Sequence, residues 1–319
     1  MRITHLNYKK RNIKAVKPYI YDGLNFKDKA YKAWKSFGGA TTNGWYPRIL
    51  HWLLFRWDVL PTLWNKRNQA RIIFIQPVSL YFDAGTSVLT HEVIPFFWDC
   101  WPCYYDKVEK WLKRHKVKTA IFTSSQEMAE IKRRLPSLNV IHCPEGIDSE
   151  SYFCGDILAN RNIDVLEFGR SNKQLINLSK VNNNFKSINT ANYSHRLCDN
   201  DFRKLLCEAK ICICFPKSMT HPEIAEGVET LTQRYWECML SRNIILGHAP
   251  KELIDIVGYN PVIEYDYTKD SAMQVQIILN NIDAYQYLVD KNRESALKYG
   301  DWKERIRIIY NKICSTQIR

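Results

Sequence analysis

The stretch EGVETLTQRYWECMLSRNIILG, residues 226–247, carries the pattern on which the fold prediction depends. It contains a helical segment, YWECML, that leads into a short apolar run, NIILG, typical of a buried strand. A helix followed at once by such a strand is the repeating unit of a parallel α/β sheet. Three charged residues, Glu229, Arg234 and Glu237, lie at this helix, and seven residues separate the two glutamates.

Strand-like and helical patterns alternate over the rest of the chain. Runs rich in β-branched and aromatic residues predict strands at RITHL (2–6), RIIFIQP (71–77), VIPFFW (93–98), KTAIFTS (118–124), NVIHCP (139–144), IDVLEFG (163–169), FKSIN (185–189), KICICF (210–215), NIILG (243–247) and PVIEYD (261–266). Helical patterns lie between them, for example at 125–135, where Ser125 is the expected N-cap. SFGGATTNG (36–44) is expected to be a loop.

We therefore predict an α/β protein of two doubly wound, Rossmann-like domains that face a cleft. Strands alternate with helices on both sides of an aperiodic stretch at 144–162, which favours two domains over one. The predicted boundaries are 1–150 and 151–319. A last helix, predicted at 301–313, is expected to cross back to the first domain.

Composition excludes several classes of protein. The 319 residues include 45% apolar and 25% charged residues, which is typical of a folded globular protein. No apolar run reaches the roughly 18 residues that a membrane-spanning helix needs. The start, MRITHLNYKK, lacks the apolar core of a signal peptide, so we expect a cytoplasmic protein. The ten cysteines are scattered and expected to be reduced, and Cys100 and Cys103 alone are too few for a zinc site.

The two halves of the chain differ in charge. Residues 1–150 hold 24 Lys and Arg against 13 Asp and Glu, a net charge of +11, whereas residues 151–319 hold 22 against 20, a net charge of +2. Eight of the ten tryptophans lie in the first 111 residues. This asymmetry favours two domains that bind different partners.

Residues at the carboxyl ends of the predicted strands are the candidates for ligand binding, because ligands of open parallel sheets bind at that edge. The candidates are Gln76, Asp99, Ser124 and Glu145 in the first half, and Gly169, Arg170, Asn189, Thr190, Pro216, Lys217 and His248 in the second. The alternative interpretation of Lys217 is a solvated loop lysine, and that of His248 is a structural histidine.

The charged residues at the helix fit one kind of ligand. A carboxylate accepts two hydrogen bonds from a sugar diol, so Glu229 and Glu237 suit hydroxyl groups. Arg234 and the N-terminal amides of a helix suit a diphosphate. Hydroxyls beside a diphosphate describe a nucleotide sugar. The alternative interpretation is that both glutamates are solvated charges on the helix surface.

At this point the sequence resembles a known family. Glu229-x7-Glu237, with RYWECM and the later GHAPKELIDIVGYNPVIEYD, resembles the donor-binding domain of GT-B glycosyltransferases. The match is to the retaining, group 1-like enzymes with an E-x7-E motif that act in bacterial polysaccharide assembly. The resemblance extends to FTSSQEMAEIKRRLPSLNVIHCPEGID (122–148) and VLEFGRS (165–171), and so covers roughly 118–319.

The resemblance implies a role for each matching residue. Glu237 would hold the ribose hydroxyls, and Glu229 would lie beside the donor sugar ring. Arg170, which follows Gly169, would meet the diphosphate with Lys217. Gly38 and Gly39 would let the donor approach the backbone closely.

The sequence departs from the family at two places. The Glu-Gly pair that often begins the motif is Glu226-Gly227, three residues early for the spacing, so Glu226 is a rival to Glu229. The helix ends in Leu-Ser-Arg (240–242), where the family usually has a small residue and Gly, and this alters the expected turn into the strand.

The resemblance also implies a reaction. A hydroxyl of a glycan or lipid-linked glycan would attack the anomeric carbon of a hexose donor, in the synthesis of a cell-surface polysaccharide such as O-antigen or capsule. Retaining transfer needs no dedicated base, whereas inverting transfer would use Asp99 or His91. The D-x-D at 199–201 does not follow an apolar strand, so we expect neither a metal nor a cofactor.

The Trp-rich stretch at 45–64 has two interpretations. Its apolar residues fall on one helical face, which suits either packing against a sheet or a place in the membrane interface. With the basic first half, the second interpretation predicts peripheral attachment to the inner face of a membrane. Two other classes stay as alternatives for the whole chain: a basic nucleic-acid-binding protein, although no binding motif occurs and no nucleic acid is expected, and a non-catalytic sugar-binding protein with a decayed site.

Overall fold

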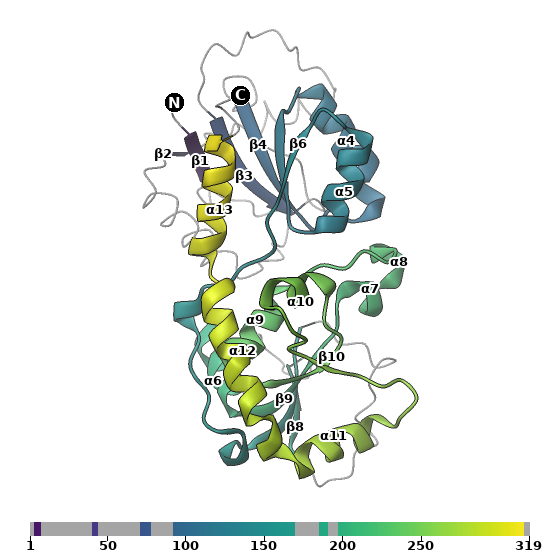
Figure 1. Cartoon of the computed structure of the whole chain (residues 1–319), viewed down its shortest axis with the longest axis vertical. Coiled ribbons are helices and arrows are strands. Elements are labelled where there is room, and N and C mark those ends of the chain that lie inside the picture. The colour runs from purple at the N-terminus through teal and green to yellow at the C-terminus, as the bar shows by residue number, and fades with distance from the viewer. Residues whose placement is uncertain are drawn as a thin grey trace. The chain divides into compact units, whose positions relative to one another are not determined.

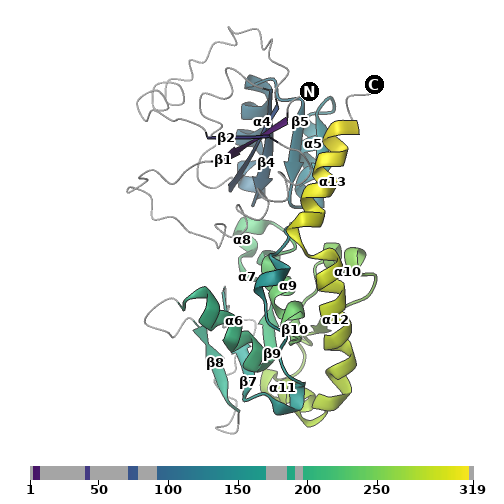
Figure 2. The ribbon, with the colours of Figure 1, turned by 90° about the vertical axis from the view of Figure 1, so that its left-hand side faces the viewer.

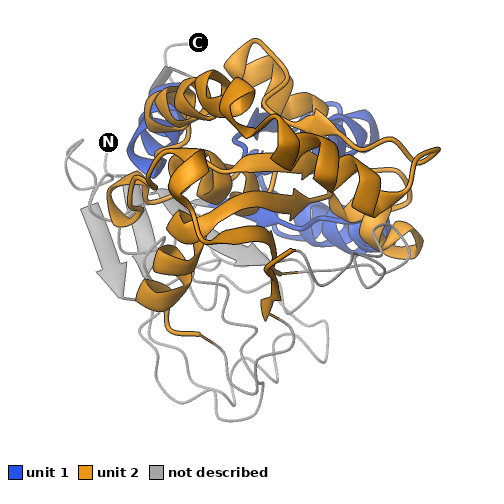
Figure 3. Cartoon of the chain, turned by 90° about the horizontal axis from the view of Figure 1, so that it is seen from below, with its two compact units in different colours: residues 1–144, 302–319 blue, residues 145–301 orange. Residues whose placement is uncertain are grey.

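The computed structural model describes residues 3–7, 40–43, 71–77, 92–169, 185–190 and 197–315, and Figures 1 and 2 show its ribbon from two directions. The chain divides into two compact units, Met1–Pro144 with Trp302–Arg319, and Glu145–Asp301 (Figure 3). The boundary lies at 144/145 rather than at 150/151. The last helix belongs to the first unit, as the predicted crossing back requires.

The first unit contains a six-stranded sheet in which every neighbouring pair of strands is parallel. Its strand order is β2 (Ala40–Asn43), β1 (Ile3–Asn7), β3 (Arg71–Pro77), β4 (Glu92–Trp98), β5 (Thr119–Phe122) and β6 (Asn139–His142). The prediction of a loop at 36–44 is wrong for the four residues of β2. This edge strand pairs with β1, with Ala40 opposite Thr4, and pairing between distant segments leaves no local period in the sequence.

Helices cover both faces of the first sheet, as the alternation of side chains along a strand allows. They are α4 (Tyr105–Arg114), preceded by the 3₁₀ turn η1 (Pro102–Tyr104), α5 (Ser125–Arg134) and α13 (Trp302–Ser315). Phe97 packs with Trp111 of α4 on one face, whereas Phe96 packs with Trp302 of α13 on the other. Ser124, not Ser125, is the N-cap of α5, because its backbone is still extended.

The second unit is built on a five-stranded sheet, again with parallel neighbours throughout. Its strand order is β11 (Ile263–Glu264), β10 (Ile244–Gly247), β9 (Ala209–Cys214), β7 (Ile163–Glu167) and β8 (Ser187–Asn189). The α-helices are α6 (Asp199–Glu208), α7 (Lys217–Thr220), α8 (Pro222–Ala225), α9 (Gln233–Leu240), α10 (Lys251–Val257), α11 (Ser271–Asn280) and α12 (Gln286–Tyr299). Among the described residues of this unit, the 3₁₀ turns are η2 (Ser149–Ser151), η3 (Leu158–Asn160) and η6 (Ile282–Tyr285).

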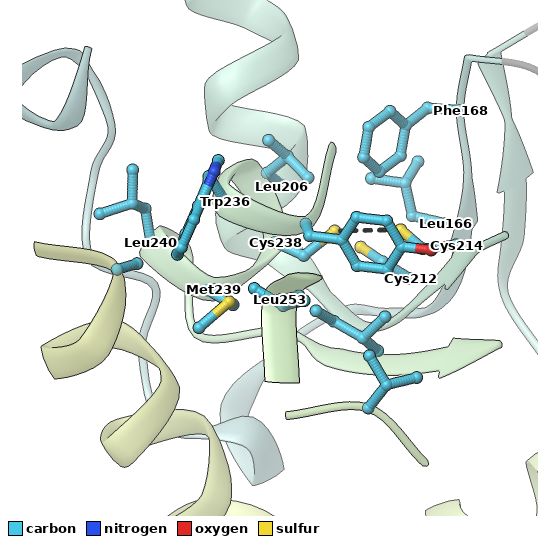
Figure 4. Close-up of a cluster of buried hydrophobic side chains, with 14 of the residues drawn as sticks. Leu166, Phe168, Leu206, Cys212, Cys214, Trp236, Cys238, Met239, Leu240 and Leu253 are labelled. Atoms are coloured by element: carbon cyan, nitrogen blue, oxygen red, sulfur yellow. Dashed lines mark hydrogen bonds between the residues drawn. The ribbon is translucent and has the colours of Figure 1, made fainter. Parts of the chain in front are cut away.

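Helix α9 lies against the centre of the second sheet and is buried from Arg234 to Leu240. Figure 4 shows Trp236, Cys238 and Met239 of α9 in one apolar cluster with Cys212 and Cys214 of β9. The Sγ atoms of Cys214 and Cys238 are 3.7 Å apart. Trp236 Nε1 also donates to the carbonyl of Glu145 at 2.9 Å. These contacts fix the position of α9 on β9.

No helix in the described part of the chain has both the length and the apolar character that crossing a bilayer requires. The Trp-rich stretch at 45–64 lies outside the described residues, so its two interpretations both stand.

The ends of β9 and β10 approach so closely that only glycine fits at position 247. A Cβ on Gly247 would lie 1.8 Å from the carbonyl oxygen of Cys214. We predict that Gly247→Ala lowers the free energy of unfolding by about 3 kcal/mol, because backbone must move to make room. Gly258→Ala is the control, because Gly258 also has a positive φ of 81° but nothing within 4 Å of the added Cβ. It should cost about 1 kcal/mol. Urea denaturation measures both, and equal losses would contradict the close approach.

Candidate functional site

The carboxyl edge of the second sheet brings together several residues that the sequence singled out. The strands are parallel, so the segments that follow β7, β9 and β10 all leave the sheet at this edge. These segments begin with Phe168-Gly169, Phe215-Pro216 and His248. Helix α9 and the loop before it contact the same edge.

Arg234 crosses the edge from the first turn of α9. The helix begins at Gln233, two residues before the predicted segment YWECML, so Arg234 lies inside it. Its side chain is buried, and Nη2 donates to the carbonyl of Phe215 at 3.0 Å. Gly169, with φ of 72°, lies directly under it, and a Cβ there would be 3.1 Å from Arg234 Cδ. The end of β7, the end of β9 and the start of α9 therefore meet at one guanidinium.

Two buried hydroxyls accompany Arg234 at the start of α9. Thr232 is the N-cap residue, but its side chain does not cap the helix. Within the described residues, Oγ1 of Thr230 and Oγ1 of Thr232 are buried without a hydrogen-bond partner. Buried polar groups are rarely left unpaired, and a bound ligand or water is the usual partner in such cases. A helix N-terminus beside a guanidinium is an electropositive place that suits an anion.

Glu237 lies one turn further along α9 and is buried. It is three residues from Arg234, a spacing that places both side chains on one face of the helix. Its Oε1 accepts a hydrogen bond of 2.9 Å from the hydroxyl of Tyr152. Arg203 of α6 lies over the ring of Tyr152, 5.2 Å from its centroid. The Glu237 carboxylate is therefore surrounded mainly by protein atoms, and the Tyr152 hydroxyl is its hydrogen-bond donor.

Glu229 lies in the loop before α9, and its side chain points to the segment after β10. Its Oε1 is 3.1 Å from Nε2 of His248, and its Oε2 accepts from the backbone N–H of Lys251 at 3.4 Å. Burial raises the pKa of the Tyr235 hydroxyl well above its usual range. Of the nearby charges, Arg234 lowers this pKa and Glu229 raises it. Tyr235 remains a donor, and it binds the carbonyl of His248 at 2.6 Å.

Glu226 occupies a different position from Glu229. It is exposed and has a left-handed backbone, φ 46°, at the end of α8, and Gly227 continues with φ 82°. The Glu-Gly pair thus forms the turn out of α8. The turn at the end of α8 therefore explains the Glu226-Gly227 pair, whereas the Glu229 side chain contacts the edge of the sheet.

The other predicted site residues are spread over both units or lie outside the described part. Lys217 is half-buried at the start of α7, after β9. Asp99 follows β4 in the first unit and has a left-handed backbone, φ 57°. Asp199 and Asp201, of the D-x-D, lie in the first turn of α6, where the helix dipole favours negative charge. Arg170, Gly38, Gly39 and His91 are outside the described residues.

Two residues of the site, Glu264 and Tyr152, were not predicted from the sequence. Glu264 is the last residue of β11, so the strand-end rule could have found it. His248 was a strand-end candidate, with a structural histidine as the alternative. Tyr152 follows no strand and shows no motif, so only the folded chain reveals its contact with Glu237.

No protein-family model matches this sequence, and no curated protein matches it. Solved structures do. Sucrose-phosphate synthase from Thermosynechococcus elongatus is 11% identical, with 99% of this chain and 100% of that chain covered and a TM-score of 0.57. HepE from Anabaena, solved in complex with UDP, is 12% identical over 99% and 100% of the two chains, with a TM-score of 0.57.

A third structure is AviGT4, a glycosyltransferase involved in avilamycin A biosynthesis, which is 11% identical over 98% of this chain and 96% of that one, with a TM-score of 0.56. The chain has the GT-B glycosyltransferase fold. At these identities the likeness concerns the fold, and the predicted fold class is confirmed.

The contact between Tyr152 and Glu237 leads to a testable prediction. Tyr152→Phe should lower the free energy of unfolding by about 1–2 kcal/mol, because a buried carboxylate loses a hydrogen-bond donor. In a double-mutant cycle with Glu237→Gln, the two changes should couple by about 1 kcal/mol. Tyr259→Phe is a matched control, since the Tyr259 hydroxyl binds Asn292 and Ser295 instead. Urea denaturation gives the four free energies, and additivity of Tyr152→Phe with Glu237→Gln would contradict the contact.

Proposed function

We propose that this protein is a glycosyltransferase that moves a sugar from a UDP-sugar to a hydroxyl of a glycan or lipid-linked glycan. The observation that carries the proposal is Arg234, buried at the first turn of α9 against Gly169, with a carboxylate on either side of it in the sequence. The GT-B fold supports it. HepE, which shares this fold, has been solved with UDP, with UDP-glucose, and with UDP and glucose.

The proposal assigns each group a part of the donor. Arg234 and the first amides of α9 bind the diphosphate, with Arg170 and Lys217 as further cations. Glu237 accepts from the ribose hydroxyls, and Glu229 accepts from hydroxyls of the sugar ring. The unpartnered hydroxyls of Thr230 and Thr232 supply further polar contacts at the start of the helix.

The proposed chemistry follows from these positions. The oxygen of an acceptor hydroxyl forms a bond to the anomeric carbon, the bond from that carbon to the diphosphate breaks, the hydroxyl proton passes to the departing diphosphate oxygen, and UDP leaves. Negative charge grows on the leaving diphosphate, and fixed cations and helix amides stabilise it more in the transition state than in the ground state. We propose a retaining, metal-independent transfer, supported by the E-x7-E spacing. For an inverting enzyme, Asp99 would be the base.

Nucleotide binding is the first test. UDP or UDP-glucose at about 100 times its Kd should stabilise the native protein by about 2.7 kcal/mol, because a ligand that binds only the folded state shifts the unfolding equilibrium. Thermal denaturation with UDP, GDP, CMP and their sugar conjugates measures the shift. Arg234→Gln and Glu237→Gln should abolish most of it.

Arg133→Gln and Glu130→Gln are the matched controls, since this pair lies on α5 in the first unit, where Arg133 is 72% exposed. They should leave the shift unchanged. Stabilisation by none of these nucleotides would refute the assignment of the donor site. Where a donor binds, its slow hydrolysis in the presence of EDTA tests metal independence, and the anomer released tests retention.

The acceptor is proposed to be presented at a membrane, in the synthesis of a cell-surface polysaccharide. The support is the net charge of +11 on residues 1–150 together with eight tryptophans in the first 111 residues, since cations and aromatic rings favour an anionic interface. We predict that the protein sediments with phosphatidylcholine vesicles that contain phosphatidylglycerol, and that salt releases it. Equal sedimentation with and without the anionic lipid would contradict electrostatic attachment.

A further inference from the structure

The ring of His248 lies between two carboxylates at the carboxyl edge of the second sheet. Nε2 is 3.1 Å from Glu229 Oε1, and Nδ1 is 2.9 Å from Glu264 Oε2. The three residues come from three segments: the loop before α9, the residue after β10, and the end of β11. This row of side chains therefore links three segments of the sheet edge that are separate in the sequence.

The backbone of His248 is held from both sides. Its N–H donates to the carbonyl of Cys214 at 3.1 Å, and its own carbonyl accepts from the hydroxyl of Tyr235 at 2.6 Å. The close approach at Gly247 directly precedes it. The ring therefore starts from a fixed backbone, and its two nitrogens are directed by this anchoring and by the two carboxylates.

Glu264 is fixed at the outer end of the row. Its Oε1 accepts from the backbone N–H of Ala249 and from Nδ2 of Asn260, both at 3.0 Å. At the inner end, Glu229 has a long contact of 3.4 Å to the N–H of Lys251 and is 28% exposed. A carboxylate accepts up to about four donors, so Glu229 can bind ligand hydroxyls in addition to its protein donors.

The net charge of this cluster distinguishes it from the proposed diphosphate site at the N-terminus of α9. A neutral imidazole carries one N–H and donates to one carboxylate, whereas the imidazolium donates to both. In either form, two carboxylates and one imidazole carry net negative charge, which repels phosphate and accepts from hydroxyls. The cluster thus suits the uncharged sugar half of a donor.

We propose that His248 is a positioning residue that holds the Glu229 carboxylate toward the hydroxyls of the donor sugar, with Glu264 fixing the His248 ring. This inference rests on the proposed function and deepens it, because it assigns recognition of the sugar, as distinct from the nucleotide, to one row of side chains. A role limited to holding the loop in place would instead affect nucleotide and sugar binding alike.

Two substitutions at His248 separate these roles. The amide nitrogen of glutamine lies about as far from the backbone as Nε2, and that of asparagine about as far as Nδ1. His248→Gln therefore keeps a donor for Glu229, whereas His248→Asn keeps only the donor for Glu264. Isothermal titration with UDP and with UDP-glucose measures the two halves of the donor.

We expect His248→Asn to weaken UDP-glucose about tenfold, as the loss of one charge-assisted contact would. His248→Gln should stay within about threefold of the native protein, and both variants should bind UDP as the native protein does. Equal weakening of UDP and UDP-glucose, or no change in either, would overturn the inference.

Glu229→Gln keeps the test decisive even where a His248 variant does not fold, since it changes one atom of the side chain. It should also weaken UDP-glucose about tenfold without weakening UDP, and an equal loss for both ligands would again overturn the inference. Failure of the native protein to bind either ligand would refute the proposed donor itself, and this outcome is distinct from all of those above.

Discussion

The geometry at the carboxyl edge of the second sheet depends on the buried guanidinium of Arg234 and on its hydrogen bond to the carbonyl of Phe215. Burying a cation is costly unless acceptors replace the water it loses, and the carbonyl of Phe215 at the end of β9 provides one. The same side chain covers Gly169 so closely that a larger residue there would displace it. Arg234 therefore fixes the positions of the end of β7, the end of β9 and the start of α9 relative to one another. The loop from Glu226 to Thr232 leads into α9 and has to be compatible with these positions.

The proposed function uses the order of the charges along the sequence. Arg234 lies at the N-terminus of α9, a position that suits a diphosphate. Glu229, which contacts His248, precedes Arg234 in the sequence, and Glu237, which accepts from Tyr152, follows it. A nucleotide sugar has hydroxyls on both sides of its diphosphate, in the ribose and in the sugar ring. The proposed function rests on this match between carboxylate, cation and carboxylate, rather than on any single residue.

Local signals made most of the fold predictable, and the contacts between distant segments made the rest unpredictable. β3 coincides with the predicted run at 71–77, and every stretch predicted as a strand overlaps one, because buried parallel strands are short apolar runs. β2 was missed because its pairing with β1 is not written in its own four residues. In the site, the candidate charges were visible as a spacing, but their partners lie 19 residues away for Glu229 and 85 for Glu237.

Arg242, at the end of α9, shows how a local conflict can be compensated by tertiary contacts. Arg242 adopts the left-handed conformation, φ 59°, that a glycine would adopt at little cost. For arginine the cost is about 1–2 kcal/mol. Its Nε donates to Asp290 of α12 at 2.6 Å and its Nη1 to the carbonyl of Gly155 at 3.0 Å, and such contacts contribute about 1 kcal/mol each. The backbone therefore keeps the turn into β10, and the side chain ties the end of α9 to two other segments of the unit. Because its last turn is held in this way, α9 keeps Arg234 and Glu237 in fixed positions at the carboxyl edge of the sheet.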